Sequence, residues 1–387
     1  MQNEINDFSF RFKITFVRII LLLILLAALG VIAVRFIFGL HTVTNLNDNW
    51  PWGLWIGFDV MCGVALAGGG YGTALLVHVL HIERLRPIAR GAMLTSLIGY
   101  LLVMAGLFLD IGRWWNFWRP FISWGHDSIL FEVFWCISAY TIVQVLEFCE
   151  ILTERIFRKL HKIFVTILPA LMIIGVAIPT MHQASLGGLY LLMDGRLHPL
   201  WWSPIIFVFF LLSSFFVGPA MIMIESAISS KTLNHKVPID VLKSLAKIGG
   251  VAMLIYLILR MTDLILRDKI GLILGNEYES LAFRLEIVIG LIVPIMIVFS
   301  PLSGSRFWLV VYGICASFGV FLNRMNVVVT GMIREMGGFY YPSIYEIIVS
   351  FGLVSAGILV YLFVCENFKI VDPNAHRKEA LPKIAPV

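Results

Sequence analysis

Long apolar runs dominate this sequence and restrict it to a membrane fold. Of its 387 residues, 59% are hydrophobic and only 14% are charged. Apolar stretches of about 18 or more residues are long enough to cross the hydrocarbon core of a bilayer as helices. A water-soluble domain could not bury so much apolar surface. The sequence therefore predicts an all-α polytopic membrane protein.

About ten transmembrane helices are expected, with connections too short for an extramembrane domain. The expected spans are residues 14–39, 52–80, 88–112, 128–151, 163–182, 204–229, 244–267, 279–299, 305–331 and 342–365. SILFE opens one span and SLAFRLE opens another, which suggests an internal repeat and two related units. We therefore expect, in order, a cytoplasmic tail (1–13), a first helix (14–39), two four-helix bundles (52–190 and 204–331), a last helix (342–365) and a second tail (366–387).

The charge distribution predicts the orientation. Loops on the N-terminal side of the bundle carry most of the Lys and Arg residues, among them Arg90, Lys162, Lys243 and Arg306. Loops rich in Lys and Arg stay on the cytoplasmic side of a membrane. We expect a multi-pass membrane protein with both termini cytoplasmic.

The segment GVAIPTMHQASLGG, residues 175–188, places polar residues and helix breakers inside an apolar run. Pro179 cannot donate a backbone hydrogen bond within a helix. The sequence therefore predicts that the fifth span ends near residue 182, with His182 and Gln183 at its outer end. Irregular backbone at this depth is tolerated only where it is buried in protein or lines a cavity. A polar pocket near the outer face is the expected consequence.

Ionisable side chains from several other spans fall at a similar depth. Charges inside a membrane are costly unless they are paired or face a cavity. Counting 1.5 Å of rise per residue places a group of polar residues toward the outer side: Asp59, Asp110, Arg113, Glu132, Arg260, Asp263, Glu286, Asn323, Arg324 and Asn326. They predict a pocket for an amphipathic ligand. Ion pairs Asp110–Arg113 and Arg260–Asp263 that only hold the bundle together are the alternative.

Metal and haem chemistry has no support in the sequence. The five cysteines are scattered, and no C-x-x-C occurs, so neither an iron–sulfur cluster nor a covalently attached haem is expected. Two helix histidines at equal depth would be needed to ligate a haem from both sides. Of the histidines within spans, His78 and His81 share one helix, and His182 has no partner at its own depth. We expect no catalytic metal in this chain.

Several motifs in order resemble one known family. They are PWGLWIGFDV, the glycines at 68–70, LDIGRWWN, SILFE, PTMHQASLG and LHPLW. With them the chain resembles, over nearly its whole length, the NrfD/polysulfide-reductase (PsrC-like) family of integral membrane subunits. It is most similar to the HybB-type membrane subunit of periplasm-facing nickel–iron hydrogenases. The segment NRMNVVVTGM, residues 323–332, is closer to relatives that are paired with multihaem cytochromes.

This resemblance implies a quinone-reactive membrane anchor of a respiratory oxidoreductase complex. Such a subunit binds menaquinone or ubiquinone and carries no haem. It exchanges electrons with a ferredoxin-like iron–sulfur subunit on the periplasmic side, which serves a periplasmic hydrogenase, a molybdenum enzyme or a multihaem cytochrome c. The resemblance also implies that Glu132, in SILFE, transfers protons linked to the quinone, and that His182 and Asp59 are pocket residues.

The chemistry of quinone reduction assigns roles to the expected site residues. The reaction consumes electrons and protons together, so the headgroup needs hydrogen-bond donors and a group that relays protons. Glu132 and His182 are expected to perform this proton chemistry. The remaining candidates are expected to bind the quinone or shape its pocket: Asp59, Asp110, Arg113, Gln183, His198, Arg260, Asp263 and Arg324.

Two other functions fit the same polar residues. A secondary transporter could use a charged site in the outer leaflet, but transporter sites usually lie near the bilayer midplane, between repeats. A purely structural anchor would need the polar groups only for packing. The expected position of the charges, toward one face, favours the quinone-linked function.

Overall fold

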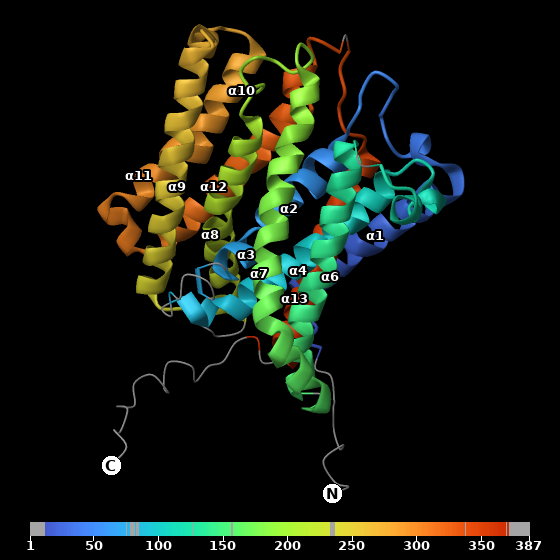
Figure 1. Cartoon of the computed structure of the whole chain (residues 1–387), viewed down its shortest axis with the longest axis vertical. Helices are drawn as coiled ribbons and strands as arrows, with labels where there is room; N and C mark the ends of the chain where they lie inside the picture. Colours follow the sequence, from blue (N-terminus) through green and yellow to red (C-terminus); the bar gives the residue numbers. More distant parts are fainter. Residues whose placement is uncertain are drawn as a thin grey trace, which may run out of the picture.

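A computed structural model describes residues 12–74, 76–77, 82, 85–125, 127–155, 158–232, 237–336, 338–368 and 370. All regular secondary structure within these ranges is helical, and nine of the described helices are long and apolar enough to cross a membrane (Figure 1). The prediction of an all-α polytopic membrane protein is thereby confirmed. His78, His81 and most of both expected tails lie outside the described residues.

Two groups of helices pack side by side, and two further helices flank them. The first group contains the π-helix η2 (Trp55–Cys62), α2 (Gly63–Leu66), α3 (Gly69–Ala74), α4 (Arg86–Asp110), α6 (Ile129–Arg155) and α7 (Arg158–Gly188). The second contains α8 (Ile206–Thr232), α9 (Ile239–Leu266), α10 (Tyr278–Ile287), the π-helix η8 (Val288–Ile292), α11 (Val293–Val298) and α12 (Arg306–Val328). The flanking helices are α1 (Phe16–Phe38) and α13 (Ile344–Asn367).

Short helices form many of the connections between these elements. They are η1 (Leu40–Thr42), η5 (Trp114–Asn116), α5 (Arg119–Ile122), η6 (Leu189–Met193), η7 (Ile270–Leu274), η9 (Pro301–Gly304) and η10 (Thr330–Met332). The groups meet where α7 and α3 pack against α8 and where η2 packs against α12. The sites described below lie in or beside these contacts.

The expected second span is not one regular helix in the described residues. It begins as the π-helix η2, continues as one turn of α2 and resumes as α3 after a turn. Glycines let this segment approach its neighbours closely: a Cβ at Gly57 would press on Val328 of α12, and one at Gly69 would press on the backbone of Gly218 in α8. π-Helical turns inside α-helices frequently occur at functional sites, and this one carries Asp59.

The predicted end of the fifth span near residue 182 is wrong. Helix α7 continues through Pro169 and Pro179 to Gly188. The Thr180 hydroxyl, next to the second proline, donates a hydrogen bond to the Val176 carbonyl at 2.7 Å. Prolines are tolerated in membrane helices because neighbouring helices and Ser or Thr side chains satisfy the freed backbone groups. His182 and Gln183 therefore lie within a helix, not at its end.

Two buried arginines attach α1 to the rest of the protein. Arg18 donates to both carboxylate oxygens of Glu366 in α13, at 3.0 and 2.7 Å. Arg35 donates to the carbonyls of Leu109, at 2.8 Å, and Ile111, where α4 ends. The last carbonyls of a helix lack partners within that helix, so Arg35 caps α4. The Arg18 ion pair also shows that α1 begins on the side where α13 ends.

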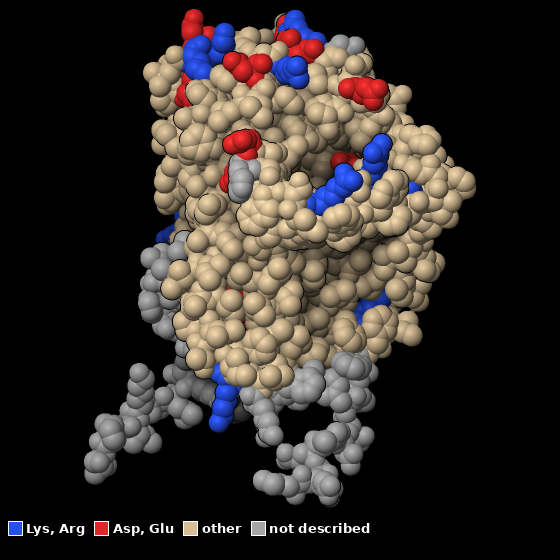
Figure 2. Space-filling model, turned by 45° about the vertical axis from the view of Figure 1, so that its right-hand side comes forward, with Lys and Arg blue, Asp and Glu red and all other residues tan. Residues whose placement is uncertain are grey.

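Charged side chains are distributed as expected for a membrane protein. On the face that Figure 2 shows, Lys, Arg, Asp and Glu gather at one end, and a broad belt below them is almost free of charge. Exposed apolar residues of α1, such as Leu23 and Leu26, also face outward. Such a surface is stable only against lipid or another apolar surface.

The contact between α12 and η8 generates a stability prediction. A Cβ at Gly319 would overlap the Cα of Gly290, so neither helix can accept a side chain there without moving apart. We expect Gly319→Ala to lower the free energy of unfolding by about 1–3 kcal/mol, as overpacking does. Thermal unfolding in detergent measures this loss. Gly304→Ala, where no atom lies within 4 Å of the new Cβ, is the control; equal melting temperatures for both variants would contradict the prediction.

Candidate functional site

A cavity with a volume of about 250 Å³ lies between η2, α2, α4, α8 and α13. Its wall is mostly apolar, with Phe58, Leu66 and Ile358 among the lining residues. The polar residues that line it are Asp59, Thr95, Glu225 and Tyr361. An apolar cavity with a few polar groups is the usual form of a small-molecule site.

The two carboxylates of this cavity lie at opposite ends of it. Ser350 of α13 donates to Asp59 at 2.6 Å. Tyr361, three turns further along α13, donates to Glu225 at 2.8 Å, and Thr95 of α4 donates to the other oxygen of Glu225 at 2.8 Å. At 1.5 Å of rise per residue, Ser350 and Tyr361 are about 16 Å apart along the helix axis. The cavity is therefore elongated, with an acid held by hydroxyl groups at each end.

A second polar feature lies on the other side of α4. His182 and Gln183 of α7 are completely buried, and none of their side-chain nitrogen or oxygen atoms has a hydrogen-bond partner in the described structure. The Tyr100 hydroxyl is likewise unpaired, and its ring centroid lies 6.2 Å from that of His182. Each unsatisfied buried polar group costs about 1–3 kcal/mol. These unsatisfied groups lower the stability of the fold, so a purely structural role does not explain them. They suit a role in binding or proton transfer.

Helix α4 separates these orphaned groups from the cavity. Tyr100 faces α6 and α7, where it contacts Tyr140 and His182, whereas Gly99 and Leu102 line the cavity. The predicted single pocket that joins Asp59 to His182 is thus divided by one helix. Asp59 lies in the cavity wall, and His182 and Gln183 lie behind it.

Glu132 is exposed at the start of α6 and accepts a hydrogen bond from the Ser185 hydroxyl of α7. Ser185 follows His182 by one helical turn, so a polar side chain lies between Glu132 at the surface and the buried histidine. Glu132 on α6 is therefore connected to α7 through Ser185, one helical turn from His182, and no hydrogen bond joins Glu132 to His182 among the described residues.

The expected ion pair Asp110–Arg113 is not formed. Arg113 is exposed in the turn after α4, and its side chain makes no hydrogen bond or ion pair among the described residues. The guanidinium near Asp110 is that of Arg35, which binds the carbonyls on either side of it. One Asp110 oxygen is buried without a partner. Arg35 of α1, and not Arg113, is therefore the cation near Asp110. Because the two residues are far apart in the sequence, their spacing could not reveal this.

The second group of helices holds a fully buried network around Glu286. Its carboxylate accepts hydrogen bonds from Trp201 and Asn323 at 2.8 Å and from Asn326 at 2.9 Å. Arg324 donates to Asn323 and to Ser213, both at 2.6 Å, and lies over the ring of Phe210 at 3.6 Å. These contacts connect α8, α10 and α12 and suit a structural role for Arg324.

The expected pair Arg260–Asp263 is also wrong. Asp263 pairs with Arg267 at 2.6 Å, one helical turn away at i+4, and accepts from Ser203 at 2.8 Å. Arg260 instead donates to the carbonyls of Leu200 and Trp201 at 2.6 and 3.3 Å. Both residues therefore fasten the segment before α8 to α9.

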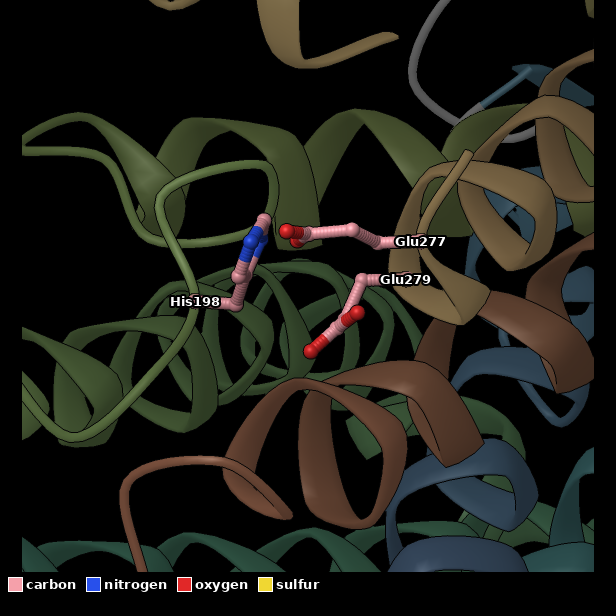
Figure 3. A group of neighbouring side chains, drawn as sticks. All are labelled: His198, Glu277 and Glu279. Carbon is pink, nitrogen blue, oxygen red and sulfur yellow. The ribbon is translucent and has the colours of Figure 1, made fainter. Parts of the chain in front are cut away.

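His198 lies in that same segment, apart from the cavity and from His182. It faces Glu277 and Glu279 at the start of α10, and potential ligand atoms of the three side chains all lie within 4.8 Å of one another (Figure 3). Burial lowers the pKa of His198, so its imidazole is largely neutral at pH 7. Sequence reasoning missed the two glutamates, because acids just before a span look like ordinary helix-start residues; their alternate spacing, E-x-E, was the only available signal.

Comparison of the sequence with known proteins shows which proteins this chain is similar to. The family model for "Polysulphide reductase, NrfD" matches residues 42–335. The chain is 30% identical over 363 residues to the "Probable Ni/Fe-hydrogenase 2 b-type cytochrome subunit" of Escherichia coli, covering 90% of this chain and 91% of that protein. It is 31% identical over 241 residues to the "Menaquinone reductase, integral membrane subunit" of Nitratidesulfovibrio vulgaris, covering 57% of this chain and 55% of that protein.

The Glu286 network generates a prediction about stability. Glu286→Ala leaves Trp201, Asn323 and Asn326 without an acceptor, and breaking a buried charged network by removing one member costs about 3–5 kcal/mol. We expect a large fall in the melting temperature in detergent, and a smaller one for Glu286→Gln, which keeps one acceptor oxygen. Asp48→Ala, at an exposed loop position, is the control. A Glu286→Ala protein as stable as this control would show that the network is dispensable.

Proposed function

The chain belongs to the NrfD family of polysulphide reductase membrane subunits, and we propose that it is the quinone-reactive membrane subunit of a respiratory oxidoreductase complex. It would exchange electrons between a redox partner and menaquinone or ubiquinone of the membrane pool. Relatives named as a hydrogenase subunit and as a menaquinone reductase subunit support this function.

The observation that carries the proposal is the elongated cavity between η2, α4, α8 and α13. Its apolar wall fits the polyisoprenoid body of a quinone, and the Asp59 carboxyl with its Ser350 hydroxyl partner offers hydrogen bonds to a headgroup oxygen. A quinone would supply the redox chemistry when bound. The residues of this chain would bind it, orient it and provide protons.

Proton transfer is assigned to the polar groups on the other side of α4. The unpaired His182 lies close to Tyr100, whose helix also forms the cavity wall, and Gln183 is the next residue of α7. Glu132 is exposed and is linked through Ser185 to the α7 turn that carries His182. We propose that Glu132 takes up or releases protons at the surface and that His182 relays them toward α4.

The partner is expected on the face opposite the start of α1 and the end of α13. An iron–sulfur subunit of the ferredoxin-like type would connect this protein to a periplasmic hydrogenase, a molybdenum enzyme or a multihaem cytochrome c. Exposed aromatic residues in the connection between α4 and α6, such as Trp115, Trp118 and Phe121, give this face an apolar surface for docking. The loop charges favour an inner-membrane protein with cytoplasmic termini.

Substitution of Glu132 tests the assigned proton transfer. Glu132→Gln keeps the hydrogen bond from Ser185 but removes the titratable group. Because general acid–base groups contribute about 10²–10⁴-fold to a rate, we expect quinone-linked turnover of the purified complex to fall at least tenfold while its subunits still co-purify. Asp127→Asn, at an exposed position a few residues earlier, should leave turnover unchanged. Unchanged turnover in the Glu132→Gln complex would remove Glu132 from the mechanism.

Filling the cavity tests the binding site. Ile224 of α8 lines it, whereas Ile173 of α7 is 66% exposed to the surroundings. We expect Ile224→Trp to raise the KM for quinone several-fold, because the indole takes space that the quinone needs. Ile173→Trp adds the same volume outside the cavity and should leave the KM as it is. Equal KM values for the two variants would place the quinone elsewhere.

A further inference from the structure

We propose that His198, Glu277 and Glu279 form a site for a divalent cation of the zinc class, on the face where α10 begins. The site is distinct from the cavity and from the polar groups around His182. It does not depend on the proposed quinone function, because its residues do not line the cavity.

The donor set is one imidazole and two carboxylates, brought together from separate parts of the chain. His198 comes from the segment between η6 and α8, and both glutamates come from the start of α10 (Figure 3). Their potential ligand atoms lie within 4.8 Å of one another. Zinc binds such ligands at about 2.0–2.2 Å, so an ion at the centre would draw them slightly closer. Rotation of the Glu277 side chain, 49% exposed, provides this movement.

An orphaned carboxylate is the independent observation that points to a cation. Glu279 is only 1% exposed, and neither of its carboxylate oxygens has a hydrogen-bond partner in the described structure. A buried carboxylate normally has a hydrogen bond, an opposite charge or a metal ion to offset its desolvation. Arg334 pairs with Glu277 at 2.8 Å, and no ion pair with Glu279 is formed among the described residues.

The contacts already made by the three side chains leave room for an ion. Arg334 binds one oxygen of Glu277, so the other oxygen remains available. The Leu200 backbone N–H lies 3.2 Å from His198 Nδ1, and a bound ion competes only with this long contact. The mixed nitrogen and oxygen donors favour zinc over calcium, which prefers oxygen ligands alone.

A cation at this position would hold together three interhelical loops on one face of the bundle. The backbone N–H of His198 already donates to the Gly331 carbonyl at 2.8 Å, at the turn η10. The glutamates add the start of α10, and Arg334 follows η10 in the chain. An ion would therefore fix the segment before α8 to the connections before α10 and after α12.

Zinc binding to the purified full-length protein tests this proposal. The protein in detergent is freed of metal with a chelator and dialysed against graded Zn²⁺, and bound zinc is measured by elemental analysis. We expect Glu279→Gln to lose one equivalent of zinc or to bind it at least tenfold more weakly. Glu335→Gln, which removes an exposed carboxylate close by but outside the group, should bind as the wild type does. Equal zinc binding by Glu279→Gln and wild type would overturn the proposal.

Thermal unfolding separates loss of the site from loss of the fold. Without zinc, Glu279→Gln should be at least as stable as the wild type, because the amide removes a buried uncompensated charge. Zinc should raise the melting temperature of the wild type and of Glu335→Gln, and leave that of Glu279→Gln unchanged. An equal rise in all three proteins would assign the effect to zinc bound elsewhere and would overturn the site.

Discussion

A polar side chain inside a lipid-facing bundle must find its hydrogen bonds within the protein, and two buried groups of this chain, around Glu286 and around His182, meet that requirement differently. In the second half, Glu286 accepts from three donors on neighbouring segments, and Arg324 lies between an amide, a hydroxyl and an aromatic ring. In the first half, His182 and Gln183 are just as buried but keep all their polar atoms unpaired. The polar groups around Glu286 therefore serve the structure, whereas those around His182 remain available for chemistry.

Helix α12 connects the Glu286 network with the segment that carries Asp59. It packs against both π-helices, with Gly319 against Gly290 of η8 and Val328 close to Gly57 of η2. The same helix carries the amides that hold Glu286. The position of Asp59 in the cavity wall is therefore set partly by contacts of the second half. A disturbance at Gly319 should reach the cavity through this helix.

The membrane fold could be predicted from the sequence because the length of an apolar run is a local property. Partners of buried charges were not predictable in the same way. Spacing suggested Arg113 for Asp110 and Arg260 for Asp263, whereas the structure supplies Arg35 from the first helix and Arg267 from the next turn. Proline also misled the prediction at residue 179, since α7 continues through Pro179 to Gly188. The cluster of His198 with two glutamates requires loops that only the folded chain brings together.

The bond between Arg18 and Glu366 joins the first membrane helix to the last one. During synthesis, the arginine emerges and enters the bilayer long before its acidic partner exists. Until α13 is made, the first helix can be held by Arg35 at the end of α4 but not by Arg18. Final closure of the molecule is consequently a late event of biogenesis, and a chain truncated before its last helix would keep an uncompensated positive charge at the membrane boundary.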